Sequence, residues 1–164
     1  MTVLLRPLAL ISLLLSGAIF GFFYAWVCST MWGLDTLPPE TAIAAMQAMN
    51  ASVRNAVFAP AYFGTPFVLL ATALVAWIAN ARVSAGLFAL AGIVSLTGGV
   101  ILTVSVNVPM NEALAQVALP VADAETVWAA YSPDWQFWNL VRTLATGAVL
   151  ALAGLALMRL PARG

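Results

Sequence analysis

Long apolar stretches without a charged residue dominate the chain. The charged residues leave four long intervals between them, residues 7–34, 55–81, 83–111 and 143–158. A helix needs about 20 residues to cross the hydrocarbon core of a bilayer, at about 1.5 Å of rise per residue. The first three intervals meet this length, and the fourth meets it when its helix starts at Trp138 and includes Arg142. The pattern therefore predicts four membrane-spanning helices, over residues 7–32, 56–79, 84–106 and 138–158.

The connector between the first two predicted spans carries a helical pattern of its own. It opens with Leu37-Pro38-Pro39-Glu40, where proline at the opening positions and an acid in the first turn favour a helix start. From Thr41 to Arg54 apolar residues recur at helical spacing, while Gln47, Asn50 and Arg54 follow one another on a neighbouring face. We expect an amphipathic helix that lies at the membrane surface and leads into the second span.

The remaining connectors indicate how the other spans are joined. The turn Asn80-Ala81-Arg82 is short, so the second and third spans should form an antiparallel hairpin. The third span is expected to end at Asn107-Val108-Pro109-Met110-Asn111. A long connector then leads to an aromatic cluster, which consists of Trp128, Tyr131, Trp135 and Trp138. The sequence thus predicts one all-α domain over residues 1–164, an integral membrane four-helix bundle with an amphipathic helix before the second span.

Composition supports a lipid environment and excludes several classes of function. The chain is 63% hydrophobic and 7% charged, with a mean hydropathy of +1.01, whereas soluble domains carry about 25% charged residues. A net charge of zero without a basic cluster argues against nucleic acid binding. With no histidine and one cysteine, Cys28, the chain offers almost no ligands for zinc, haem or copper. We therefore expect no metal and no cofactor, and membrane lipid as the surrounding partner.

The distribution of charges predicts an orientation. Four of the six arginines fall on one side of the four-helix topology, namely Arg6, Arg82, Arg159 and Arg163. The acidic residues lie in or beside the connectors on the opposite side. Because cytoplasmic loops carry an excess of basic residues, we expect both termini to be cytoplasmic, in a bacterial inner membrane. The first apolar run is too long for a signal peptide and lacks a clear A-x-A site, so we expect it to be retained as a span.

Polar residues gather where three predicted spans meet the outer membrane boundary. They are Asn50, Arg54 and Asn55 before the second span, Asn107 and Asn111 at the end of the third, and Asn139, Arg142 and Thr143 at the start of the fourth. An ionisable group inside a span costs about 2.5–3.5 kcal/mol at mid-bilayer and less near the interface. Because of this cost, we expect Arg142 either to pair with another polar group or to have a functional role.

Two interpretations of this cluster stay open. In the first, Arg142 pairs with Glu112 or Asp134 and fastens the fourth span to the outer loops. In the second, Arg54 and Arg142 form, with the asparagines, a polar pocket for an anionic or enolisable ligand. Helical spacing also allows a cation–π contact between Arg142 and Trp138.

Four segments resemble those of a known protein family. In two of them, the one that starts at Asn107 and the one that includes Trp138, both the order and the spacing of the residues match the family. The segments are Gly21-Phe22-Phe23-Tyr24-Ala25, Ala45-Met46-Gln47-Ala48-Met49-Asn50, Asn107-Val108-Pro109-Met110-Asn111 and Trp135-x-x-Trp138-Asn139-x-x-Arg142-Thr143. In this order the chain resembles the anthrone oxygenase-like family of small four-helix membrane proteins, formerly catalogued as a domain of unknown function. Characterised relatives oxidise an anthrone to an anthraquinone with O2 and no evident cofactor. The resemblance implies an oxidoreductase of the monooxygenase type that binds a planar hydrophobic substrate near the outer membrane face.

The resemblance and the polar cluster together suggest roles for individual residues. Donors that stabilise a developing oxyanion, and so act as catalytic residues, would be Arg142, Asn139 and Asn107. Substrate-binding residues would be Asn50, Arg54, Asn111, Trp138 and Thr143. The alternative is a non-catalytic membrane protein that binds a lipid, a quinone or a partner helix through the same cluster. A homo-oligomer stays open, whereas four short helices leave little room for a channel or transporter pore.

Overall fold

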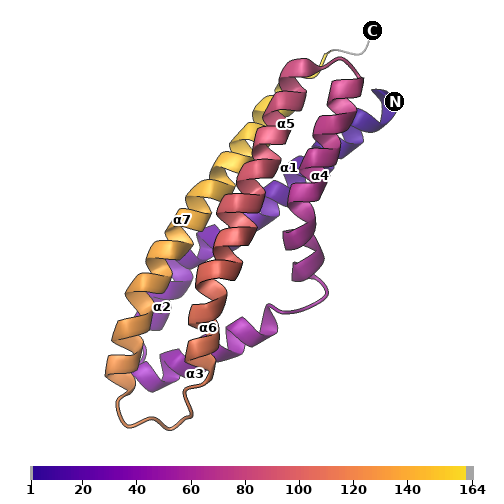
Figure 1. Ribbon diagram of the computed structural model, residues 1–164. Helices are drawn as coiled ribbons and strands as arrows, with labels where there is room; N and C mark the ends of the chain where they lie inside the picture. The colour runs from indigo at the N-terminus through magenta and orange to yellow at the C-terminus, as the bar shows by residue number, and fades with distance from the viewer. Residues whose placement is uncertain (1, 162–164) are drawn as a thin grey trace.

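The computed structural model describes residues 2–161, with side chains from residue 4 onward, and this part of the chain is helical without strands. The described chain forms four long helical stretches, and Figure 1 shows them side by side, with the helix Pro39–Ser52 across one end of the bundle. The elements, in chain order, are α1 (Thr2–Ala25), a π-helical segment (Trp26–Thr30), α2 (Met31–Asp35), α3 (Pro39–Ser52), α4 (Phe58–Ile78), α5 (Arg82–Val94), two π-helical segments (Ser95–Ile101 and Thr103–Asn107), α6 (Val108–Ala115) and α7 (Ala124–Met158).

Four of these helical stretches are long and apolar enough to cross a membrane. They are Leu4–Asp35, Phe58–Ile78, Arg82–Ala115 and Ala124–Met158. The first joins α1 to α2 through one π-helical segment, and the third joins α5 to α6 through the other two. The prediction of an all-α, four-helix membrane fold is confirmed.

The third and fourth helices extend beyond the ends that the sequence pattern predicted. The sequence around Asn107 does not end a helix, because a π-helical segment passes directly into α6 there and the rod continues through Pro109. α7 begins at Ala124 because Asp123 caps it: its side chain accepts a hydrogen bond from the backbone N–H of Thr126 at 3.4 Å. The aromatic cluster that was expected in a connector therefore lies on α7.

The helix α3 is the predicted helix before the second span, and it lies across the end of the bundle (Figure 1). It buries Ala42, Ile43 and Met46 against apolar side chains of α2, α6 and α7. On its neighbouring face Gln47 Nε2 donates hydrogen bonds to the carbonyls of Leu114 and Val117, at 2.8 and 2.9 Å. These contacts hold α3 against the end of α6 and fix the position of the segment that follows it.

Asp35 fastens the end of the first long helix to α7. Its Oδ1 accepts hydrogen bonds from Trp128 Nε1 at 3.0 Å and Ser132 Oγ at 2.7 Å, and its Oδ2 accepts one from Gln136 Nε2 at 2.9 Å. All three donors lie on α7. Hydrogen bonds to a charged group contribute about 1.5–3 kcal/mol each in typical proteins, so this carboxylate is a strong local link.

Small residues allow close packing inside the bundle. A Cβ atom built on Gly98 would lie 2.8 Å from the Cβ of Ala145 on α7, which is closer than two carbons can approach. At Gly21, by contrast, a Cβ would meet nothing within 4 Å among the described residues. Gly98 therefore allows the helical stretch Arg82–Ala115 to approach α7 closely within the bundle.

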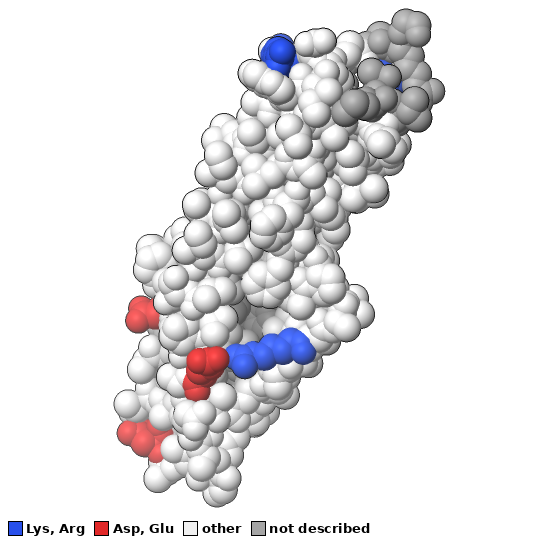
Figure 2. Space-filling view, turned by 45° about the vertical axis from the view of Figure 1, so that its right-hand side comes forward, with Lys and Arg blue, Asp and Glu red and all other residues white. Residues whose placement is uncertain are grey.

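The two ends of the bundle differ in charge. Both termini and the α4–α5 turn lie at one end, while α3 and the α6–α7 connection lie at the other (Figure 1). Arg6 and Arg82 belong to the first end, where Arg6 Nη2 donates to the carbonyl of Pro161 at 2.9 Å and the Arg82 guanidinium lies 3.7 Å over the Trp77 ring. Figure 2 shows the acidic side chains of the visible face gathered toward the other end. Arg163, which was predicted to join the basic end, lies outside the described residues.

Candidate functional site

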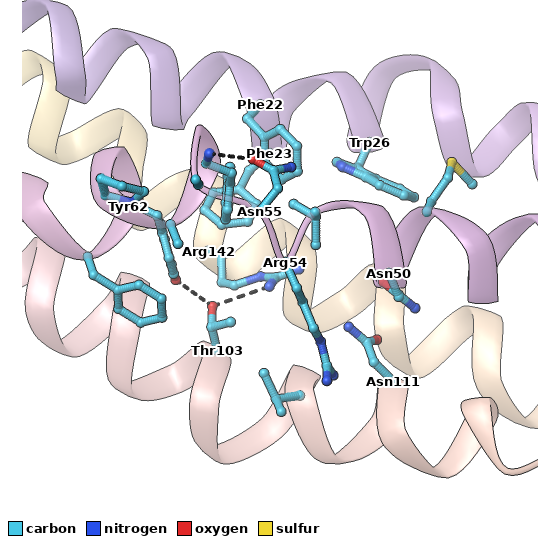
Figure 3. Close-up of a pocket in the computed structure, with 18 of the residues that line it drawn as sticks. Phe22, Phe23, Trp26, Asn50, Arg54, Asn55, Tyr62, Thr103, Asn111 and Arg142 are labelled. Carbon is cyan, nitrogen blue, oxygen red and sulfur yellow. Dashed lines mark hydrogen bonds between the residues drawn. The ribbon is translucent and has the colours of Figure 1, made fainter.

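A cavity of about 530 Å³ opens in the half of the bundle next to α3. This volume lies within the range of about 300–1,000 Å³ that is typical of small-molecule sites. Its walls are mainly aromatic, from Phe22, Phe23, Trp26, Phe58, Tyr62, Phe63 and Trp135. The polar groups among the lining residues are few, and they come from Asn50, Arg54, Asn55, Tyr62, Thr103, Asn111 and Arg142. Figure 3 shows these side chains converging from different helices on one space.

Local departures from a regular helix shape this cavity. Trp26 and Thr103, which both line it, lie in π-helical segments, whose wider turns are frequent at functional sites. The linker between α3 and α4 forms another wall. Asn55 holds this linker, because its Oδ1 accepts the backbone N–H groups of Val57 and Phe58 at 2.8 and 2.9 Å, and its Nδ2 donates to the Ser52 carbonyl at 2.7 Å.

Arg142 is the charged group inside the cavity, and its side chain is only 4% exposed. Its Nη2 donates to Asn139 Oδ1 at 2.9 Å, and its Nη1 donates to Thr103 Oγ1 at 3.2 Å. The guanidinium carbon also lies 4.5 Å from the centre of the Phe23 ring and 5.3 Å from that of Trp135. Its Nε has no hydrogen-bond partner among the described residues. The cation is thus held in place by neutral groups and ring faces.

Within residues 4–161, no carboxylate forms an ion pair with Arg142. Asp134 does not line the cavity, and Glu112 pairs with Arg54 instead, at 3.6 Å between Glu112 Oε1 and Arg54 Nη2. The interpretation that Arg142 fastens α7 to an outer-loop carboxylate is therefore wrong for the described chain. A buried cation without an anionic partner is costly in an apolar surrounding, and a negative or partially negative group beside the guanidinium would lower this cost.

The mouth of the cavity is polar and open. The side chains of Arg54 and Glu112 are 57% and 58% exposed, and an exposed pair of this kind contributes about 0–1 kcal/mol to stability. Figure 2 shows the surface hollowed beside an acidic and a basic side chain in contact. Arg54 and Arg142 line the same cavity, one at its mouth and one buried inside it.

Tyr62 and Thr103 extend the network around Arg142, and the sequence analysis did not select either of them. The Tyr62 hydroxyl lies 2.7 Å from Thr103 Oγ1 and 2.7 Å from the Gly99 carbonyl oxygen. Since Thr103 also accepts a bond from Arg142, a continuous chain links the phenol to the guanidinium (Figure 3). The available signal was a tyrosine in an otherwise apolar span and a threonine one turn before Asn107. Both residues lie inside the expected spans rather than at the expected membrane boundary, where polar residues stand out in the sequence.

Asn139 and Thr143 lie behind Arg142 rather than in the cavity wall. Besides accepting the bond from Arg142, Asn139 donates from Nδ2 to the Phe23 carbonyl at 3.2 Å, which links α7 to α1. Thr143 Oγ1 donates to the Asn139 carbonyl at 2.8 Å within its own helix. Asn139 is therefore in contact with the cation, and Thr143 is one step further away.

Asn107 is fully buried, and neither atom of its side-chain amide has a hydrogen-bond partner among the described residues. It does not line the cavity wall, but helical spacing puts it on the same side of its rod as Thr103 and Asn111, which do. Leaving a buried polar group unpaired costs about 1–3 kcal/mol in typical proteins. The rod that carries Thr103 and Asn111 thus also holds two buried polar atoms without a partner among the described residues.

Asn50 and Asn111 lie together at another part of the cavity wall (Figure 3). Asn111 Oδ1 accepts two hydrogen bonds, from Tyr131 Oη and from Trp135 Nε1, both at 2.8 Å. Asn50 Nδ2 is buried and has no partner among the described residues. The two amides bring unused N–H groups to the cavity.

Trp138 does not line the cavity, and the ring that meets Arg142 from α7 is Trp135. The predicted cation–π contact thus involves the residue seven positions before Arg142 and not the one four positions before it. At about 100° per residue a separation of seven returns to within about 20° of the same direction, and a separation of four only to within about 40°. Trp138 is half-buried and packs edge-on against Phe137.

Comparison with known proteins identifies the family. The family model described as anthrone oxygenase matches residues 54–152. The matched region includes Arg54, Thr103, Asn111 and Arg142 and leaves Asn50 outside it. No curated protein and no solved structure matches the chain. Because the match covers more than half of the chain, the protein belongs to the anthrone oxygenase family.

Proposed function

We propose that this membrane protein binds a planar, hydrophobic anthrone-type substrate in the cavity and promotes its oxidation by O2. The observation that carries the proposal is Arg142, a buried cation without a carboxylate partner among the described residues, set in an aromatic-lined cavity. Membership of the anthrone oxygenase family supports the choice of substrate class. In this reaction the CH2 group opposite the carbonyl loses two hydrogens and gains one oxygen atom of O2. The second oxygen atom leaves as water.

Arg142 would assist by stabilising negative charge. Loss of a proton from the CH2 carbon gives an anion whose charge is shared with the carbonyl oxygen, and this anion can pass an electron to O2. A fixed N–H donor aimed at such an oxygen in a water-poor site is worth far more than the same donor in water. Asn139 and Thr103 would hold the guanidinium in position, and the ring faces of Phe23 and Trp135 would limit its motion.

The other polar residues would surround the oxyanion or bind other parts of the substrate. We assign Asn107 to the polar surroundings of the oxyanion, and Asn50, Arg54 and Asn111 to substrate binding. Aromatic walls suit a flat fused-ring body, because offset and edge-on ring contacts add about 0.5–1.5 kcal/mol beyond burial of area. The exposed side chain of Arg54 leaves the mouth open to solvent, where a released proton can leave.

We also propose a location for the site in the membrane. The arginines of one end and the acidic residues of the other support an orientation with both termini in the cytoplasm. The cavity would then lie toward the outer face of a bacterial inner membrane. There it is open to hydrophobic compounds that are dissolved in the lipid.

Filling the cavity is expected to stop the reaction. Ala59 lines the cavity on α4, whereas Ala71 is exposed on the same helix. Ala59→Trp would occupy the space of the substrate rings, so oxygen uptake with anthrone should fall to the rate of an empty detergent sample. The matched control Ala71→Trp adds the same side chain on the lipid side and should keep the wild-type rate. Chelator-treated protein in detergent is used throughout.

Other outcomes of this oxygen-uptake experiment would contradict the proposal. If the wild-type protein consumes oxygen no faster than the protein-free autoxidation of anthrone, the oxygenase proposal is wrong. If Ala59→Trp retains the wild-type rate, the reaction takes place outside this cavity. Binding of the compound without any oxidation would instead indicate a membrane protein that binds ring compounds, lipids or quinones.

A further inference from the structure

The amide of Asn111 is held with its nitrogen directed away from its neighbours on α7. Tyr131 Oη and Trp135 Nε1 are both hydrogen-bond donors toward it, at 2.8 Å each, so the atom that faces them must be the amide oxygen. These two bonds use both lone pairs of that oxygen. The NH2 group is left on the other side of the amide, and Asn111 lines the cavity. Its N–H groups therefore offer hydrogen bonds to a ligand and not to α7.

Asn50 adds a second unused donor at the same place. Its Nδ2 is buried and has no partner among the described residues, and Asn50 lines the cavity next to Asn111 (Figure 3). The two residues come from α3 and α6, which Gln47 ties together. The cavity thus holds two amide NH2 groups whose natural complement is an oxygen acceptor.

This pair occupies a different part of the cavity wall from Arg142. Thr103, which accepts from Arg142, and Asn111 lie eight residues apart on one continuous helical rod. The Trp135 ring lies between Arg142 and Asn111: its centre is 5.3 Å from the guanidinium carbon, and its Nε1 donates to Asn111 Oδ1 at 2.8 Å. Between the two positions the cavity is walled by Phe22, Phe23 and Trp26 (Figure 3). The cavity therefore has hydrogen-bond donors at two ends and ring faces between them.

We infer that Asn50 and Asn111 form a second oxygen-binding position, so that the cavity prefers ring compounds that carry an oxygen acceptor at each of two opposite edges. One edge meets Arg142, and the other meets the two amides. This inference rests on the proposed function, because it describes how the same cavity selects among planar ring compounds. A carbonyl, phenolic or carboxylate oxygen at the second edge satisfies the amide donors, and a ring edge that bears only C–H groups leaves them unpaired.

The inference is tested by comparing two ring compounds of almost equal size. Anthrone has one carbonyl, and anthraquinone has two at opposite edges of the central ring. Binding is followed under argon, so that no oxidation occurs, through quenching of tryptophan fluorescence, since Trp26 and Trp135 line the cavity. We expect the wild-type protein to bind anthraquinone about 3- to 10-fold more tightly than anthrone, as one to two net hydrogen bonds allow.

Two variants probe the amides separately. Asn50→Leu removes a donor that has no hydrogen-bond partner among the described residues. Asn111→Asp keeps an oxygen for Tyr131 and Trp135 and replaces the NH2 group by a second oxygen. In both variants the ratio of the two affinities should fall toward one. The ratio cancels any general change in cavity shape, because the two compounds share the same ring body.

Each outcome bears on the inference. A ratio that stays at the wild-type value in both variants overturns it, and oxygen uptake with anthrone then shows whether the proposed function still stands. An equal affinity of the wild-type protein for both compounds also overturns it. If neither compound quenches the fluorescence of the wild-type protein, both the inference and the proposed function fail together.

Discussion

Replacing Arg142 by methionine is expected to slow the oxidation of an anthrone by at least about 100-fold, the usual cost of losing one oxyanion donor, without unfolding the bundle. Methionine fills similar space with a flexible apolar chain, and it removes a cation that lacks an anionic partner among the described residues. The variant loses the cost of a buried cation without an anionic partner, but it also loses the hydrogen bonds to Asn139 and Thr103. Because these two effects oppose each other, the variant should unfold near the wild-type temperature, while its oxygen uptake falls to background.

This combination of results separates a functional role from a structural one. If Arg142 mainly held α7 in place, Arg142→Met would lower both the unfolding temperature and the activity. Arg142→Lys provides a graded control, because it keeps the charge but cannot donate to Asn139 and Thr103 in the same planar geometry. We expect its rate to lie between those of the wild-type protein and Arg142→Met. Thermal unfolding in detergent and oxygen uptake on the same samples provide the two readouts.

Asn107→Leu is expected to stabilise the protein. Both polar atoms of this fully buried amide are unpaired among the described residues, and an unsatisfied buried group costs about 1–3 kcal/mol. Leucine has the same branched arrangement of side-chain heavy atoms and no polar atom. The free energy of unfolding should thus rise by about 1–3 kcal/mol, and the oxidation rate should fall if Asn107 belongs to the polar surroundings of the oxyanion.

The same substitution at Asn139 is the matched control. Asn139 is also buried, but its Oδ1 accepts from Arg142 and its Nδ2 donates to the Phe23 carbonyl. Asn139→Leu should therefore destabilise the protein by about 1–3 kcal/mol, because it leaves the partners of a buried amide unsatisfied. A loss of stability in Asn107→Leu as large as that in Asn139→Leu would mean that Asn107 has partners in solution, such as a bound water.

The helices could be predicted from the sequence because charge-free intervals are a direct consequence of a lipid environment. Their ends could not be predicted in the same way. The third helix passes through Pro109, where a π-helical segment runs directly into α6, and the fourth begins at Ala124 because Asp123 caps it. Both features depend on a local hydrogen bond or on its absence. Mean hydropathy, which is averaged over a window of residues, does not detect such single hydrogen bonds.

The candidate site was predicted in part, for a similar reason. Four residues chosen from the sequence line the cavity, namely Asn50, Arg54, Asn111 and Arg142. They were found because a charge or an amide next to an apolar span is unusual. Tyr62 and Thr103 were missed because tyrosine and threonine are common in membrane helices, and only their contact with Arg142 through three-dimensional packing sets them apart.

The central claim is that Arg142 stabilises a substrate anion inside the cavity. It is tested most directly by the absorption spectrum of anthrone bound under argon to the wild-type protein and to Arg142→Met, at a pH where free anthrone stays neutral. The anion absorbs at longer wavelength than the neutral compound, because its charge is delocalised over all three rings. We predict the spectrum of the anion with the wild-type protein and of the neutral compound with Arg142→Met. A neutral spectrum with both proteins, or the same anion with both, would contradict the claim.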